Sequence, residues 1–170
     1  MFTCGDLACV VGTDMRARVL HPVTGVTAAL PHDLADQNKP WEGWRLEEMY
    51  HAFTYAFGRV SSTGEYKVLR VVRLSPDQRD EQLVEVLALD RLAGAGARWR
   101  GMQNPPSHLT GASNADMAVV AGVVHFLVVQ THLPFEQDYN ANTHPGSIAS
   151  FDLDTEQWMP LLHGPLHSLH

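Results

Sequence analysis

Cysteine, basic charge and long apolar runs are all scarce in this chain of 170 residues. Its two cysteines, Cys4 and Cys9, cannot by themselves build a disulfide framework or a zinc site, so we expect a reducing compartment, cytoplasmic or nuclear. Twelve Lys and Arg against nineteen Asp and Glu give a net charge of −7, which is the wrong sign for binding a nucleic-acid backbone. The longest apolar run, residues 117–129, is interrupted by His125 and is shorter than the roughly 20 residues of a membrane span. We therefore expect neither nucleic acid nor a membrane as a partner.

Sequence patterns typical of catalysis and cofactor binding are also missing. The ten histidines are scattered without metal-ligand spacing, and one close pair, His163 and His167, is separated by Pro165. No phosphate-binding glycine loop and no Gly-x-Ser-x-Gly elbow occurs. We expect His125 to be a hydrogen-bonded core histidine, and both cysteines to be small buried side chains rather than nucleophiles. The sequence thus predicts no enzyme activity, no metal and no cofactor.

Short β-rich runs bounded by turn residues dominate what remains. Residues 83–90 fit a strand or a helix, and their neighbours favour a strand; residues 117–129 predict one long strand or two short ones, with Gly122 at the bend. The long connection 31–48 leads into an expected turn of helix near residues 45–49. The other expected strands are 8–11, 17–20, 26–30, 52–58, 66–74, 97–100, 148–153 and 157–161.

The 66–74 run has apolar side chains on both faces, but neither face is purely apolar. Tyr66, Val68 and Arg70 share one face, whereas Lys67 and Leu69 share the other. This alternation is typical of a strand inside a sheet whose two sides are both partly covered.

Three hairpin-like segments share one pattern: an apolar run, a polar turn that contains threonine, and a second run. The turn threonines are Thr24, Thr63 and Thr155, at intervals of 63 − 24 = 39 and 155 − 63 = 92 residues, the latter being twice 46. A period of about 40–50 residues built from short strands is typical of a β-propeller, with one four-stranded blade per period. Chance similarity among the hairpins of a β-sandwich is the alternative. We predict one all-β domain over residues 1–170, a partial β-propeller-like array of antiparallel sheets with about 2.5–4 blades.

Several segments, in order along the chain, match one known family. They are Cys-Gly-Asp-Leu at 4–7, His-Pro-Val-Thr-Gly at 21–25, Phe-Gly at 57–58, Thr-Gly-Glu-Tyr-Lys-Val-Leu-Arg at 63–70, and Ile-Ala-Ser-Phe-Asp-Leu-Asp-Thr-Glu at 148–156. On these residues the chain resembles the plant F-box-associated domain, which follows the F-box in a large family of ubiquitin-ligase adaptors. The 63–70 and 148–156 matches are the most specific pair.

The resemblance implies a protein-interaction domain that recognises the target protein of an SCF-type ubiquitin ligase. The sequence shows no F-box, so we expect a fragment or a shortened paralogue, and a Skp1-type adaptor as a partner only if an F-box lies upstream. A free-standing β-propeller-like binding module without a ligase role is the alternative. Phe135 and Tyr139, aromatics in a polar loop, are the candidate protein-binding residues. Because an incomplete ring leaves sheet edges unpaired, we also expect marginal stability or self-association.

Overall fold

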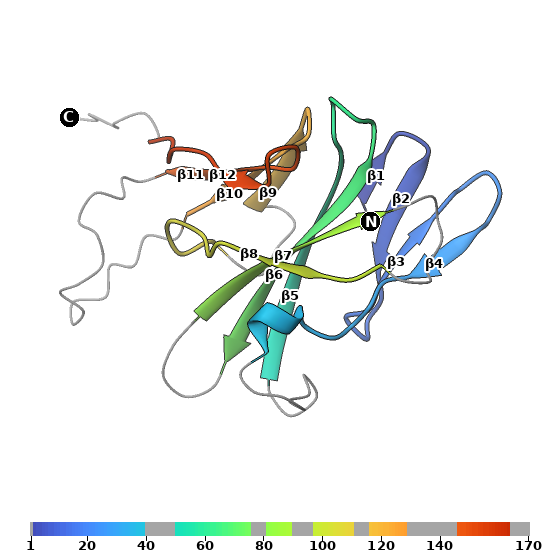
Figure 1. Ribbon diagram of the computed structural model, residues 1–170, viewed down its shortest axis with the longest axis horizontal. Helices are drawn as coiled ribbons and strands as arrows, with labels where there is room; N and C mark the ends of the chain where they lie inside the picture. Colours follow the sequence, from blue (N-terminus) through green and yellow to red (C-terminus); the bar gives the residue numbers. More distant parts are fainter. Residues whose placement is uncertain are drawn as a thin grey trace.

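Three four-stranded antiparallel sheets form the computed structural model (Figure 1). The structure describes residues 2–39, 50–75, 81–89, 97–110, 116–128 and 146–163. In each sheet the strands are neighbours in space in the order in which they follow one another along the chain. Consecutive antiparallel hairpins give this order. The predicted all-β class and the partial propeller-like array are confirmed.

Most of the expected strands are present with shifts of a few residues at their ends. Sheet 1 holds β1 (Phe2–Cys4), β2 (Leu7–Val11), β3 (Ala17–Leu20) and β4 (Thr27–Ala29). Sheet 2 holds β5 (Tyr50–Arg59), β6 (Tyr66–Ser75), β7 (Glu81–Leu89) and β8 (Arg100–Met102). Sheet 3 holds β9 (Met117–Val120), β10 (Val123–Leu127), β11 (Ile148–Asp152) and β12 (Gln157–Trp158). A short 3₁₀ helix, η1 (Asp36–Asn38), lies between sheets 1 and 2 in the sequence.

The first strands of the three sheets lie side by side. Strand β1 contacts β5, and β5 contacts β9. From these strands the other members of each sheet extend outward, sheet 1 to one side of sheet 2 and sheet 3 to the other (Figure 1). First strands that converge while their sheets diverge are the arrangement of propeller blades around a hub.

Two hydrophobic cores lie on the two faces of sheet 2. Phe57, Val68 and Leu87 pack against sheet 1, and the alternate residues Leu69 and Val86 pack against sheet 3. Sheet 2 is therefore the middle blade and is buried on both sides. This confirms the expectation that both faces of the 66–74 strand are covered. Residues 83–89 of the ambiguous 83–90 run are a strand, as part of β7.

The β3–β4 and β5–β6 hairpins close with the same loop, residues 21–26 and 60–65. In each loop the N–H of the first residue donates to the carbonyl of the last, at 2.9 and 2.8 Å. The N–H of the fifth residue donates to the carbonyl of the first, again at 2.9 and 2.8 Å. That fifth residue is Gly25 or Gly64, with φ of +71° and +74°, a conformation that glycine adopts without steric cost. The Thr-Gly repeat seen in the sequence is therefore a repeated loop structure.

A buried ion pair fixes the segment that leads out of sheet 1. Arg70 on β6 and Glu85 on β7 face each other across the strands, with 2.6 Å between Arg70 Nε and Glu85 Oε2, and both side chains are fully buried. The other carboxylate oxygen accepts from the backbone N–H of Ala35 at 2.7 Å and from Asn38 Nδ2 at 2.8 Å. The guanidinium stacks on Trp99, 4.1 Å from the ring centroid. Residues 35–38 are thus held against sheet 2 by a buried ion pair whose carboxylate also accepts hydrogen bonds from this segment.

Two details differ from the sequence expectations. The chain begins its first sheet with β1, which was not predicted because three residues carry too little pattern. Trp99 is buried but precedes β8 instead of lying in a strand, since β8 starts at Arg100. The 117–129 run takes the second of its two expected forms, because it divides at a two-residue turn, Ala121-Gly122, into β9 and β10. The helical turn found is η1, whereas the one expected near residues 45–49 lies outside the described residues. Within the described ranges, no helix has the length and apolar character needed to cross a membrane.

Candidate functional site

Three turns from two sheets meet at one end of the molecule, the upper end in Figure 1. They are the β5–β6 loop (60–65), the β9–β10 turn (121–122) and the β11–β12 turn (153–156). The Ser61 hydroxyl donates to the Ala121 carbonyl at 3.3 Å, and the Leu153 N–H donates to the Gly122 carbonyl at 3.0 Å. The first of these hydrogen bonds joins a turn of sheet 2 to a turn of sheet 3, and the second joins the two turns of sheet 3 to each other.

Glu156 has a left-handed backbone conformation, and the corresponding residue of the β3–β4 and β5–β6 loops is a glycine. It follows Thr155 as Gly25 follows Thr24 and as Gly64 follows Thr63, and its φ is +56°. For a residue with a Cβ this left-handed conformation costs roughly 1–2 kcal/mol. Strain of this kind persists only where surrounding contacts hold it, and such positions cluster at functional sites.

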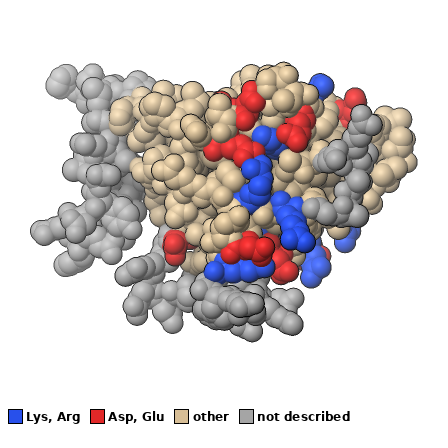
Figure 2. All heavy atoms as spheres, viewed as in Figure 1, with Lys and Arg blue, Asp and Glu red and all other residues tan. Residues whose placement is uncertain are grey.

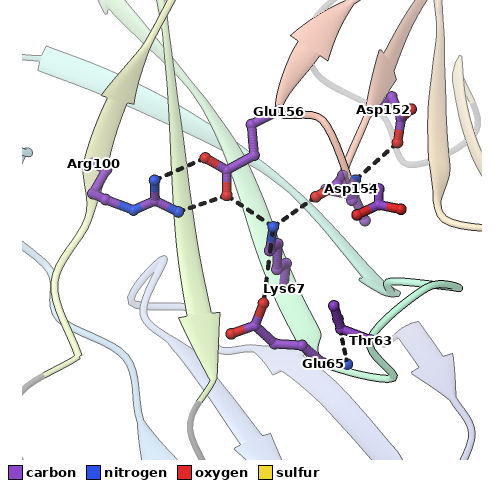
Figure 3. A network of polar contacts seen from close by, with 8 residues as sticks. Thr63, Glu65, Lys67, Arg100, Asp152, Asp154 and Glu156 are labelled. Carbon is purple, nitrogen blue, oxygen red and sulfur yellow. Dashed lines mark hydrogen bonds and ion pairs between the residues drawn. The ribbon is translucent and has the colours of Figure 1, made fainter.

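Two cations from sheet 2 hold the Glu156 carboxylate (Figure 3). Arg100, at the start of β8, donates through both terminal nitrogens, at 2.8 Å to Oε2 and 2.6 Å to Oε1. Lys67 on β6 donates to Oε1 at 2.9 Å and to the Leu153 carbonyl at 2.8 Å. The Glu65 carboxylate lies 3.9 Å from the same ammonium. We call Glu65, Lys67, Arg100 and Glu156 the interblade cluster.

The four side chains of the interblade cluster differ in how much of each is exposed to solvent. The Lys67 side chain is 8% exposed and that of Glu156 is 18% exposed, whereas the Arg100 and Glu65 side chains are 48% and 41% exposed. Burial by itself would raise the pKa of the Glu156 carboxyl, but the hydrogen bonds and positive charges of Arg100 and Lys67 outweigh burial and hold that pKa below its usual value. The same carboxylate raises the pKa of the Arg100 guanidinium. Glu156 and Arg100 are therefore charged at neutral pH, and the cluster has a buried half and a solvent-facing half.

The charged side chains on this side of the molecule gather in a band across its middle (Figure 2). The exposed parts of Arg100 and Glu65 offer a donor fork and an acceptor to a polar or charged group of another molecule. The arrangement suits binding by charge-assisted hydrogen bonds.

The histidine and cysteine side chains that the sequence analysis considered lie outside the interblade cluster. His125 is half-buried on the side of sheet 3 that faces away from sheet 2, and its Nδ1 lies 2.8 Å from Ser150 Oγ, so it is hydrogen-bonded as expected but outside the core. Cys9 is fully buried in β2, and burial raises the pKa of its thiol to about 11, so at neutral pH it is not a thiolate. Cys4 in β1 is only half-buried, contrary to expectation. In the part of the chain that the structure describes, no three His, Cys, Asp or Glu side chains are grouped to hold a metal ion.

Phe135 and Tyr139, the protein-binding residues predicted from the sequence, lie outside the described residues. The interblade cluster was not predicted. The signal that could have found it is the third turn of the repeat, where Thr-Glu stands at 155–156 in place of Thr-Gly at 24–25 and 63–64. Asp152 stabilises its own turn, since its Oδ1 accepts from the Asp154 N–H at 2.8 Å.

Comparison with family models, with curated proteins and with solved structures found no match for this chain.

Proposed function

We propose that this chain is a protein-interaction domain that holds a target protein at the end where sheets 2 and 3 meet, as the substrate-recognition part of an SCF-type ubiquitin ligase. The observation that carries the binding site is Glu156, a charged residue kept in a strained conformation where the two sister turns have glycine. A glycine there would close the hairpin at lower cost, so the carboxylate has a role beyond the turn.

The ligase role rests on the resemblance to F-box-associated domains, and the fold gives that resemblance a physical context. The two most specific matches, residues 63–70 and 148–156, are far apart in the sequence but supply three of the four members of the interblade cluster. Lys67 comes from the first match and Glu156 from the second, and they meet at 2.9 Å. The motif pair thus corresponds to one place on the molecular surface.

Proximity labelling with the full-length gene product tests the proposal. The wild-type protein is expected to label a Skp1-type adaptor, a cullin and a small set of target proteins. Arg100→Glu should keep the adaptor and lose the targets, because it reverses the exposed charge of the cluster. Arg98→Glu is the matched control, since Arg98 is exposed and lies outside the cluster.

Two outcomes would count against the proposal in different ways. If wild type and Arg100→Glu labelled the same targets equally, the binding site would not lie at the interblade cluster. Targets labelled without any ubiquitin machinery would reject the ligase role and leave the alternative, a free-standing binding module.

A further inference from the structure

The two end sheets each turn one face away from sheet 2. On sheet 3, Val124 and Phe126 of β10 pack into the core that it shares with sheet 2, so their alternating neighbours point the other way. This outward face carries aliphatic side chains beside the hydrogen-bonded pair of His125 and Ser150, and Ser150 is buried. Val120 is 60% exposed and Leu127 is 40% exposed.

Sheet 1 has an outward face that carries aliphatic side chains and a basic residue. Cys9 and Val19 pack toward sheet 2, so Ala8, Val10 and Arg18 lie on the other side, where Val10 pairs directly with Arg18. Arg18 is exposed. On sheet 3 the corresponding charged residue is acidic: Asp152, on β11, alternates with the core residue Phe151 and therefore points outward.

The contact between sheets 2 and 3 shows how one blade packs on the next in this chain. It joins alternating aliphatic side chains on both sheets and adds an ion pair of opposite charges, Lys67 with Glu156. The outward faces of sheets 3 and 1 carry the same kinds of side chain. Both have aliphatic residues, and sheet 3 adds the acidic Asp152 whereas sheet 1 adds the basic Arg18. The three described sheets are also half of a six-bladed ring, and closed propellers have four to eight blades.

We propose that two copies of this chain close into a six-bladed ring, in which sheet 3 of each copy packs on sheet 1 of the other. A two-fold axis relates the copies, so the ring contains two identical contacts and assembly stops at two. This assembly is independent of the proposed function, since neither outward face includes the interblade cluster.

Sedimentation equilibrium over a wide concentration range measures the assembly. We expect a single species of twice 18.8 kDa at high concentration, dissociating to 18.8 kDa on dilution. A monomer at every concentration would overturn the proposal. So would a series of ever larger species, because a head-to-tail contact that fails to close forms filaments.

Charge-introducing variants identify the faces. Val120→Lys on sheet 3 and Arg18→Glu on sheet 1 should each give a monomer, because each places like charges across the contact. Val23→Lys is the matched control: Val23 is 89% exposed in the β3–β4 loop, outside both faces, and this variant should remain a dimer. Leu127→Lys is a second sheet 3 variant in case Val120→Lys fails to fold, which circular dichroism would show.

Mixing the two monomeric variants distinguishes the proposed contact from other dimers. One copy of Arg18→Glu and one of Val120→Lys can form a ring in which one contact is wild type and the other joins the new Glu to the new Lys. We therefore expect the mixture to recover a mass of twice 18.8 kDa. A dimer that survives Arg18→Glu but not Val120→Lys would instead join sheet 3 to sheet 3, and the ring would be rejected.

Discussion

Two substitutions of Glu156 separate the effect of backbone strain in its turn from the effect of its negative charge on stability. Glu156→Gln keeps the left-handed backbone and the side-chain shape but removes the negative charge. Glu156→Gly removes the charge and also the strain. Asp154→Asn, in the same turn, is the control, because Asp154 is exposed and no contact of its carboxylate belongs to the interblade cluster.

The expected magnitudes follow from the exposure of the partners. Breaking a fully buried ion pair costs about 3–5 kcal/mol, whereas an exposed pair is worth about 0–1 kcal/mol. Lys67 is buried and Arg100 is half-exposed, so we expect Glu156→Gln to lower the free energy of unfolding by about 2 kcal/mol. Relief of roughly 1–2 kcal/mol of strain should leave Glu156→Gly only about 0–1 kcal/mol below wild type. Asp154→Asn should change the stability by less than about 0.5 kcal/mol.

Urea denaturation followed by tryptophan fluorescence measures these differences. The expected order of stability is wild type, then Glu156→Gly, then Glu156→Gln. If Glu156→Gly were more stable than wild type by the full strain of about 1–2 kcal/mol, Lys67 and Arg100 would contribute nothing through the carboxylate, and the account of the cluster would be refuted. If the Gln and Gly variants were equal, the left-handed conformation would carry no strain.

The pH dependence provides a second measurement on the same variants. The pKa of the Glu156 carboxyl is lower in the folded chain than its ordinary value of about 4.3. The unfolded state therefore takes up a proton first as the pH falls, and the stabilisation by Glu156 is complete above that value and lost below it. The difference between wild type and Glu156→Gln should be constant from about pH 5 to pH 8 and should shrink below about pH 4. A difference that does not change on acidification would show that the charge is not the cause.

Three further changes have expected outcomes that thermal or chemical denaturation and mass spectrometry can check. Ala121→Asn should raise the free energy of unfolding by about 0.5–1 kcal/mol, because Ala121 has a φ of +49° in a two-residue turn where asparagine is favoured, and Ala118→Asn in β9 should give no such gain. Glu85→Ala should lower it by about 3–5 kcal/mol, since it leaves the Arg70 guanidinium buried without its carboxylate, and replacing both residues by apolar ones should cost less. Cys9 should remain unlabelled by iodoacetamide at pH 8 in the folded protein and react after denaturation, because its thiol is buried and has a pKa of about 11.

The sheets were predictable because the information for them is local. Runs such as 17–20 and 148–152 carry β-branched or aromatic residues between turn signals, and they form strands almost as expected. The Thr-Gly turns were predictable for the same reason, since glycine at the fifth loop position meets a backbone requirement. β1 was missed because three residues give no periodicity.

The interblade cluster could not be predicted because its members come together only through packing between sheets. Lys67 and Glu156 are distant in the sequence, and Arg100 belongs to a short strand on the far side of sheet 2 from β5. Local reasoning placed the interaction site at Phe135 and Tyr139 because aromatics in polar loops are the signal that a sequence shows. The substitution of Glu for Gly at a repeated position is also visible in the sequence, but its meaning depends on knowing that the turns are equivalent.

Strand β6 shows how charged residues can specify an arrangement that apolar residues leave open. Its aliphatic side chains could pack against any other sheet of similar width, since hydrophobic contact has no direction. Arg70 and Lys67 lie on opposite faces of β6 and each requires particular partners: Glu85 and the 31–39 segment on one side, Glu156 and the Leu153 carbonyl on the other. A shift of sheet 3 would take Glu156 and the Leu153 carbonyl from the buried Lys67, at a cost of several kcal/mol, and a shift of the segment that leads out of sheet 1 would take the His32 and Asp33 carbonyls from Arg70. The mixed character of β6, which in the sequence only indicated two covered faces, thus fixes the order of the three blades and brings the interblade cluster together.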